Sequence, residues 1–400
     1  MKMTLDINRL ESATIFVVCL GVVVWVAVTG VISTSYELLR ISLLAALFLL
    51  IRFFCMKNIP SLTGSGAIVM GIGIFINGAI VHFPLINKEF ARPLTLILFL
   101  LFLFIAGSYI VDVVKGRAFK MHFANPIGSF AVGTWIAGAS VCGIALCQRL
   151  PDWKPLVQIL IIGNISLWFY FVYRSLRNFF FLFSGQSWRN VHGVLFLSTV
   201  STQSLVIVWK AAFGTSFFYR LVAPWMILLG VLFYLISFYL IMRRYSHEGK
   251  GIDLDKGWFN TNCIIHGAMS ITGLASAVCG VVSANLILLI WLWVIFWFVV
   301  VEVVEIARAV KRTRLYGFVD GLLIYDPTQW SRNFTFGMLY AFTVNFDLAN
   351  SAAANSFLQL LHDGLPLYLA KVVLLLLLVE IVVFFRDRMT PVVSSVEFKP

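Results

Sequence analysis

The chain has 400 residues, of which 60% are hydrophobic and only 12% are charged, and its mean hydropathy is +0.94. This composition excludes an ordinary soluble domain and predicts an all-α polytopic membrane protein. The formal net charge of +12 at pH 7 would suit a nucleic-acid-binding protein. However, the basic residues are concentrated in alternate loops between apolar stretches, so we expect no nucleic-acid partner.

Twelve apolar stretches are long enough to cross a bilayer as helices. They are 13–32, 38–55, 63–83, 92–113, 126–147, 153–173, 190–212, 221–243, 262–282, 286–308, 331–353 and 365–386. The first leads directly into the second, which indicates a retained hairpin and not a cleaved signal peptide. The sequence therefore predicts a transmembrane hairpin over 1–60, a ten-helix domain over 61–388 and a short tail over 389–400.

Glycine is concentrated in every second stretch of the last ten. The stretches that start at 63, 126, 190, 262 and 331 hold 5, 4, 1, 3 and 1 glycines, and those that start at 92, 153, 221, 286 and 365 hold 1, 1, 1, 0 and 0. Small residues let helices approach closely or line a narrow wet path, whereas bulky apolar residues face lipid. The alternation predicts five quasi-symmetric hairpins, with inner helices around a central pore. Close packing without a pore is the alternative.

Basic residues gather in every second loop of this arrangement. One such loop holds Lys115, Arg117 and Lys120, and another covers 308–314 with four cations. The intervening loops hold few. This positive-inside bias predicts a multi-pass protein of the cell membrane with both termini in the cytoplasm.

Each of the five predicted inner stretches, which start at 63, 126, 190, 262 and 331, also carries a short signature. The signatures include GAIVMGIGIFING at 66–78, GTWIAG at 133–138, VSTQSL at 200–205, GAMSI at 267–271 and YDPTQW at 325–330. Together, and in this order, they resemble the tellurite-resistance/dicarboxylate transporter family, which includes bacterial TehA-type proteins and the plant slow-type anion channels. The resemblance covers roughly residues 60–388.

The resemblance implies ten core helices in five hairpins around a central pore, an assembly that is commonly a homotrimer, and a Phe that blocks the pore. That Phe falls on Phe336, and Phe334 is the second candidate. Where the family usually has Pro, this chain has Gly337, which permits a looser kink. Since the chain holds 37 Phe, ordinary packing is the alternative for Phe336.

The candidate pore-lining residues are small or hydrogen-bonding residues of the glycine-containing stretches. They are Gly71, Gly73, Gly133, Thr134, Thr202, Gln203, Gly267, Ser270 and Gly337. Thr202 and Gln203 can donate hydrogen bonds to an anion, but hydrogen bonds between helices would explain them equally well.

These observations favour an anion channel or passive exporter, whose partners are small inorganic or organic anions and the lipid bilayer. A coupled carrier for C4-dicarboxylate, sulfite or tellurite-type anions is the alternative. The two hypotheses differ in whether His192, His266 or Glu305 faces the pore. Glu302 and Glu305 are expected to pair with Arg308 or to reach the interface.

A membrane enzyme or a cofactor protein is less favoured, and a purely structural scaffold leaves the small-residue interior unexplained. The sequence has no phosphate loop and no nucleophile beside a base, and its six Cys form no CxxC pair. Its six His include no pair four residues apart. We therefore expect no catalytic residue, no cofactor and no metal site.

Overall fold

The computed structural model describes residues 62–185, 187–247, 253–280, 282–353 and 355–389. The predicted hairpin over 1–60 and nearly all of the predicted tail over 389–400 lie outside the described residues. Within the described ranges the structure is helical and contains no strand. Eight of the described helical segments are long and apolar enough to cross a membrane. The predicted class, an all-helical polytopic membrane protein, is confirmed.

Short and long α-helices alternate along the described chain. The short ones, of 12 to 17 residues, are α3 (Gly66–Asn77), α5 (Gly133–Arg149), α7 (Leu197–Phe213), α9 (Ile264–Cys279) and α11 (Trp330–Asn345). The long ones, of 31 to 39 residues, are α4 (Pro84–Val114), α6 (Lys154–Ser184), α8 (Phe217–His247), α10 (Ala284–Leu322) and α12 (Ser356–Met389).

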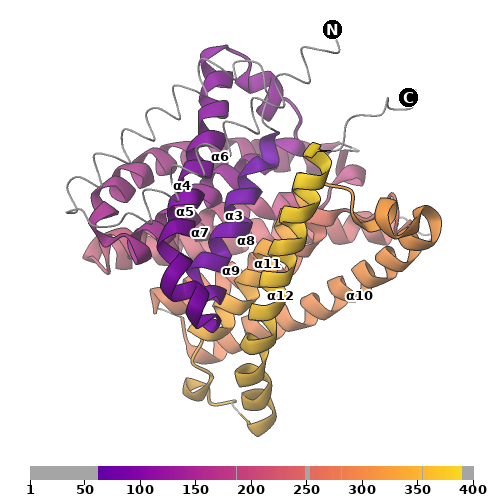
Figure 1. The fold of residues 1–400 in the computed structure, drawn as a ribbon. Helices are drawn as coiled ribbons and strands as arrows, with labels where there is room; N and C mark the ends of the chain where they lie inside the picture. Colours follow the sequence, from indigo (N-terminus) through magenta and orange to yellow (C-terminus); the bar gives the residue numbers. More distant parts are fainter. Residues whose placement is uncertain (1–61, 186, 248–252, 281, 354, 390–400) are drawn as a thin grey trace.

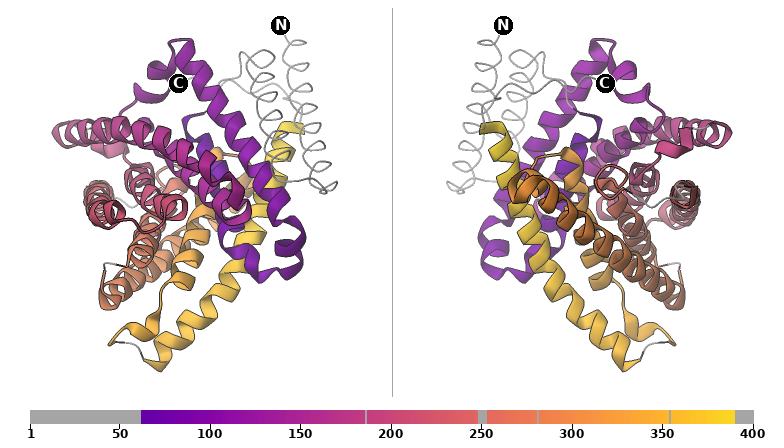
Figure 2. Two further views of the ribbon diagram at one scale, coloured as in Figure 1. Left: turned by 90° about the vertical axis from the view of Figure 1, so that its left-hand side faces the viewer. Right: turned by 90° about the vertical axis from the view of Figure 1, so that its right-hand side faces the viewer.

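The five short helices form a closed ring, which we call the inner ring. Their contacts run from α3 to α5, α7, α9 and α11, and then back to α3. Each long helix packs outside the ring on the short helix that precedes it and on the one that follows, and α12 closes the circle by packing on α11 and α3. Figures 1 and 2 show the long helices around this interior.

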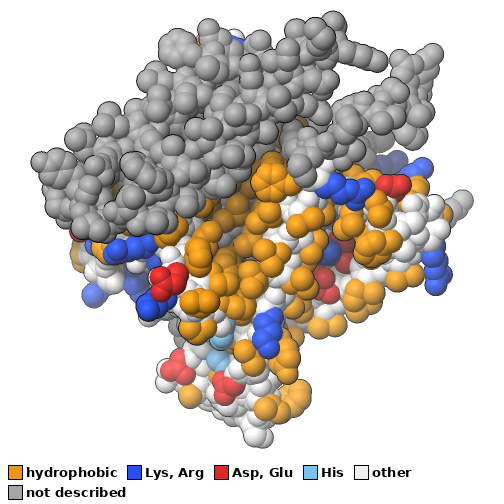
Figure 3. All heavy atoms as spheres, in the orientation of Figure 1, with side chains coloured by type: hydrophobic (Ala, Val, Ile, Leu, Met, Phe, Trp, Pro, Cys, Tyr) orange, Lys and Arg blue, Asp and Glu red, His pale blue; other side chains and the backbone are white. Residues whose placement is uncertain are grey.

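Burial agrees with the glycine pattern. In the spans that contain α5, α7 and α9, 72–83% of the most apolar window is buried, against 28–50% in the long helices. The exposed side chains of the long helices are large and apolar, for example Leu367, Tyr368 and Leu375 on α12. Figure 3 shows such side chains spread over the face of α12. Such an apolar surface is suited to contact with the hydrocarbon core of a bilayer.

A short 3₁₀ turn precedes every inner helix. These turns are η1 (Thr63–Ser65), η4 (Gly128–Val132), η7 (Gly193–Phe196), η8 (Asn260–Cys263) and η9 (Pro327–Gln329). They contact one another in the same circular order as the helices they precede, and we call them the entry ring. The N-termini of all five inner helices therefore converge at one end of the molecule.

Two predicted spans are shorter than expected. Helix α3 ends at Asn77 because Gly78 has non-helical angles (φ −135°, ψ −80°), and α11 ends at Asn345. At 1.5 Å per residue these helices cover only about 18 to 24 Å, less than the roughly 30 Å of a hydrocarbon core. Neither is among the eight spanning segments, whereas α5, α7 and α9 reach 20 to 22 residues with their entry turns.

Candidate functional site

Helix α11 carries both predicted gate residues, and the contacts of its side chains show which neighbouring helix each of its faces is directed to. One face is directed outward to α10, since three of its side chains contact that helix. The pairs are Arg332 with Glu305, Phe336 with Phe298, and Thr343 with Trp291. In the second pair the ring centroids are 5.0 Å apart, with the rings nearly perpendicular.

The two flanks of α11 contact its neighbours in the inner ring. Toward α3, a Cβ on Gly337 would lie 2.5 Å from Ile74, and a Cβ on Gly71 would lie 3.7 Å from the Asn333 Cβ. Toward α9, Thr335 and Phe342 fill the space beside Gly267 and Gly273 respectively.

The remaining face of α11 is directed to the centre of the inner ring. With 3.6 residues per turn, Phe334, Met338 and Ala341 lie opposite the side that contacts α10. All three are buried, and Phe334 is only 1% exposed. Helix α3 behaves similarly, because Met70 lies between Gly66 and Gly73, which face α5, and Ile74, which faces α11. Phe334 is therefore the centre-facing aromatic residue of α11, and Phe336 packs on its outer side.

The predicted pore-lining glycines lie where helices of the bundle meet. A Cβ on Gly71 would lie 2.9 Å from the Trp330 ring of α11, and a Cβ on Gly133 would lie 2.7 Å from the Leu197 carbonyl oxygen of α7. Gly73 faces α5 and α4, Gly267 faces α11, and Gly337 faces α3. These glycines bring the inner helices together and so set the diameter of the ring.

The predicted polar residues are hydrogen-bonded to neighbouring elements or within their own helix. The Trp168 indole of α6 donates to Thr202 (3.0 Å), and the Gln203 amide donates to the Ile227 carbonyl of α8 (3.1 Å). The hydroxyl of Thr134 donates to the Ala131 carbonyl (2.7 Å), and that of Ser270 to the His266 carbonyl (2.9 Å). Thr202 and Gln203 are thus directed to the outer helices.

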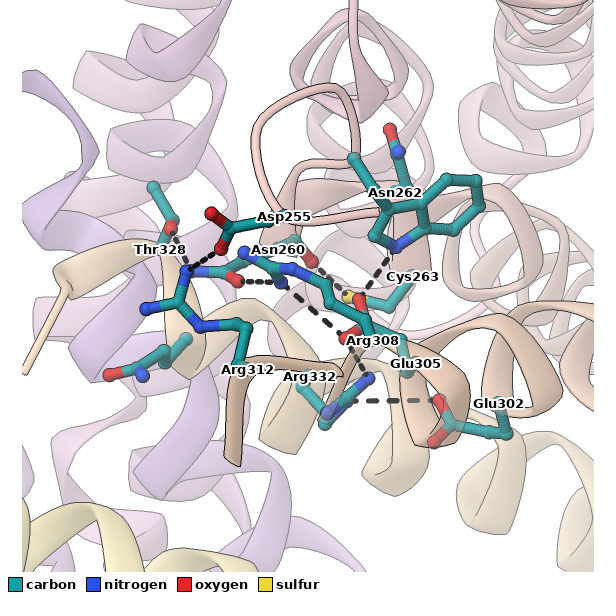
Figure 4. A network of polar contacts seen from close by, with 12 residues as sticks. Asp255, Asn260, Asn262, Cys263, Glu302, Glu305, Arg308, Arg312, Thr328 and Arg332 are labelled. Carbon is teal, nitrogen blue, oxygen red and sulfur yellow. Dashed lines mark hydrogen bonds and ion pairs between the residues drawn. The ribbon is translucent and has the colours of Figure 1, made fainter. Parts of the chain in front are cut away.

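A partly buried charged network lies beside the start of α11 (Figure 4). The Arg332 guanidinium lies 3.0 Å from Glu305 Oε2 and 3.7 Å from Glu302 Oε1, both on α10. Arg308 also approaches Glu305 Oε2 at 3.5 Å, and the Trp258 indole donates to Glu305 Oε1 at 2.8 Å. Pairing of Glu305 with Arg308 was expected from the sequence, but Arg332 was overlooked. In the sequence, Arg332 lies three residues after a loop, where a cation at the membrane interface is expected. Only the fold brings Arg332 next to the two carboxylates.

Hydrogen bonds that involve side chains join the turns of the entry ring to one another and to α5. Trp135 of α5 donates to the Thr63 carbonyl of η1 (2.7 Å), and the Gly193 amide of η7 donates to Asn262 of η8 (2.9 Å). His192 Nδ1 lies 2.8 Å from Thr261 Oγ1. Burial, and secondarily the charge of Arg244, lowers the pKa of His192 to about 4, so this imidazole is neutral near pH 7.

At the opposite end, side-chain donors bind the last carbonyls of the inner helices. Arg149 of α5 donates to the Ile76 carbonyl of α3 (3.2 Å), and Lys210 of α7 donates to the Val278 carbonyl of α9. Cations near helix C-termini are stabilised by the macrodipole. The converging helix N-termini therefore give one end of the inner ring positive potential, and at the other end Arg149 and Lys210 offset the negative potential of the helix C-termini.

Two groups proposed to distinguish a carrier from a channel lie on the outer side of the ring. Glu305 belongs to α10, and His266 of α9 packs against Phe298 of α10 with ring centroids 5.3 Å apart. His266 is fully buried, and neither of its ring nitrogens has a hydrogen-bond partner in the described part of the chain. Among the described residues, no three His, Cys, Asp or Glu side chains are grouped as metal ligands would be.

Comparison of the sequence with protein-family models gives no match, and comparison with curated proteins gives none either.

Proposed function

We propose that this protein is an anion channel or passive exporter whose path runs along the axis of the inner ring, with Phe334 as the residue that closes it. The observation that carries this proposal is the centre-facing position of Phe334 on α11. Bulky apolar side chains close narrow paths by steric block and by dewetting. Met70 of α3 adds a second apolar side chain on the same central side.

The charge distribution favours anions over cations. Five inner helices point their N-termini at the entry ring, and the cationic segments 115–120 and 308–314 flank this end of the molecule. Arg149 and Lys210 supply positive charge at the other end. Such fields raise the local concentration of anions and weaken with salt.

The proposal extends to the finer sequence-based expectations. The chain would be a distant member of the tellurite-resistance/dicarboxylate transporter family, with twelve spans including the hairpin over 1–60. It would lie in the cell membrane with both termini in the cytoplasm, as a homotrimer. Small inorganic or organic anions would be its partners, and no enzymatic step, nucleic acid, cofactor or metal would be involved.

The test is chloride and nitrate flux through purified full-length protein in liposomes. We compare wild type with Phe334→Ala and with Phe336→Ala, a matched aromatic truncation two residues away. We expect low flux in wild type, non-saturating anion flux in Phe334→Ala, and flux close to wild type in Phe336→Ala. If Phe336→Ala alone conducts, Phe336 closes the path. If neither variant conducts, the channel proposal is wrong.

One observation favours the coupled carrier as a second candidate. Glu302, Glu305 and Arg332 are ionisable groups that contact one another between two apolar helices, and such groups in membrane proteins often mark ion or proton pathways. Saturable uptake that depends on a proton gradient in wild-type liposomes, without passive flux in Phe334→Ala, would support the carrier.

A further inference from the structure

Arg332 lies two residues before Phe334 and points away from the centre of the inner ring. Its side chain is 30% exposed, whereas the side chain of Glu305, 3.0 Å away on α10, is 6% exposed. Glu302 is one turn earlier on the same face of α10, 3.7 Å from the guanidinium. Figure 4 shows both carboxylates directed at Arg332. Since α11 is rigid over two residues, the position of Arg332 determines where Phe334 points.

Both carboxylate oxygens of Glu305 have partners. Its Oε1 accepts from the Trp258 indole at 2.8 Å, and its Oε2 lies near both Arg308 and Arg332. Separating Arg332 from Glu305 removes one of the two cations beside a carboxylate that is only 6% exposed, which is unfavourable. The pair therefore resists any movement of α11 away from α10.

The same network reaches two turns of the entry ring. Arg308 donates to Asn260 Oδ1 of η8 at 2.6 Å, and Asn260 donates to the Thr328 hydroxyl of η9 at 3.1 Å. Turn η9 leads directly into α11, and Thr328 in turn donates to Asp326 at 2.6 Å. The first turn of α11 is thus fixed from α10 and from η8 at once.

We propose that Arg332 is a positioning residue for the gate: its ion pairs with Glu305 and Glu302 fix α11 against α10 and keep Phe334 directed at the centre of the inner ring. This inference rests on the proposed channel function. Weakening the pair frees α11 to tilt or rotate, so that Phe334 leaves the centre for part of the time.

The test measures anion flux in liposomes for Arg332→Gln, Glu305→Gln and Arg332→Lys, each with Phe334 intact and in the Phe334→Ala background. With Phe334 intact, we expect Arg332→Gln and Glu305→Gln to raise basal flux by at least about tenfold, because each removes an ion pair in which one partner is buried. Arg332→Lys keeps the positive charge, so we expect its flux to stay about as low as in wild type. With Phe334 removed, the same changes should leave flux unaltered, since no gate remains to be positioned.

A matched control is Lys88→Gln. This side chain forms a 3.5 Å ion pair with Glu89, but both partners are more than half exposed, and exposed pairs contribute little. We expect no change in flux. Glu302→Gln removes only the longer contact with Arg332, should raise flux less than Glu305→Gln, and keeps the test decisive if Arg332→Gln does not fold.

The outcomes separate this inference from the proposed function. If Phe334→Ala conducts but no change at Arg332, Glu302 or Glu305 raises flux, the positioning role is wrong and the channel stands. If Arg332→Gln changes flux equally with and without Phe334, the network acts on the path and not on the gate, which also overturns the inference. If Phe334→Ala does not conduct, the channel proposal itself fails.

Discussion

At the scale of single residues, the inner ring depends on positions where no side chain fits. Gly133 lies against the backbone of α7, where an added Cβ would be 2.7 Å from the Leu197 carbonyl oxygen. A backbone atom cannot move aside as a flexible side chain can. The glycine is therefore required for the approach of α5 to α7, which makes it a structural residue of the ring.

Gly133→Ala is expected to destabilise the protein by about 1 to 3 kcal/mol, because overpacking forces the two helices apart. The matched control is Gly163→Ala on α6, where no atom lies within 4 Å of the added Cβ. There Ala removes the helix penalty of Gly and should be neutral or stabilising by up to about 1 kcal/mol. Thermal unfolding of both variants in detergent checks the pair, and equal melting temperatures would contradict the close-approach argument.

His192 gives the entry ring a dependence on pH. Its ring stacks on Phe259 with centroids 4.5 Å apart, and burial lowers its pKa from 6.5 to about 4. Below pH 6.5 the unfolded chain binds a proton that the folded protein does not. The neutral imidazole therefore imposes no cost above about pH 6.5, and stability is lost progressively as the pH falls toward 4.

This loss should reach at most about 3.5 kcal/mol, since one pKa unit corresponds to about 1.4 kcal/mol. Melting temperatures measured from pH 7.5 to 4.5 should fall more steeply for wild type than for His192→Gln. His82 is exposed at the other end of the bundle, and His82→Gln should retain the wild-type slope. Parallel curves for wild type and His192→Gln would show that His192 is not the source.

At the scale of elements, the short inner helices need partners for their last carbonyls. Four side chains supply them: Arg149 to Ile76, Gln158 to Ala212, Lys210 to Val278, and His362 to Phe346. Only Arg149 and Lys210 carry a permanent charge. These two therefore cap helices and also contribute to the field at this mouth.

We expect Lys210→Gln and Arg149→Gln to lower anion flux about twofold to threefold at low salt in the Phe334→Ala background, because each removes one charge near the path. The effect should shrink at 1 M salt, where the Debye length is about 3 Å. Lys154→Gln, an exposed position at the start of α6, is the control and should leave flux unchanged. A reduction that persists at high salt would instead indicate altered packing.

The sequence predicted the alternation of inner and outer helices, because glycine and lipid-facing bulk are properties of single stretches. It put the gate on Phe336 and named Phe334 as the second candidate, but the face that each residue occupies depends on where α3, α9 and α10 pack, which the sequence does not show. It also missed the ends of α3 and α11 and the ion pair of Arg332. One feature of the sequence did point to a partner such as Arg332. Glu302 and Glu305 lie three residues apart on one helix face, and two such carboxylates require a cation from another helix when they are buried.

At the scale of the whole molecule, the two ends of the helical bundle differ. The entry ring and the segments 187–192, 253–259 and 323–326 share one end, and the segments 282–283 and 346–353 lie at the other. Most cations of the connecting segments are at the first end. The positive-inside rule predicts from this that the entry ring faces the cytoplasm and that the second end faces outward.

This orientation can be tested with single cysteines in intact cells. Asp320 lies near the end of α10 on the entry-ring side, and Ala353 lies in the α11–α12 connection on the other side; both are exposed. A membrane-impermeant thiol reagent should label Ala353→Cys, and should label Asp320→Cys only after permeabilisation, relative to the parent protein with its native cysteines. The reverse pattern would place the entry ring outside. Anions would then meet the converging helix N-termini first from the external solution, and the rule based on basic loops would not hold for this chain.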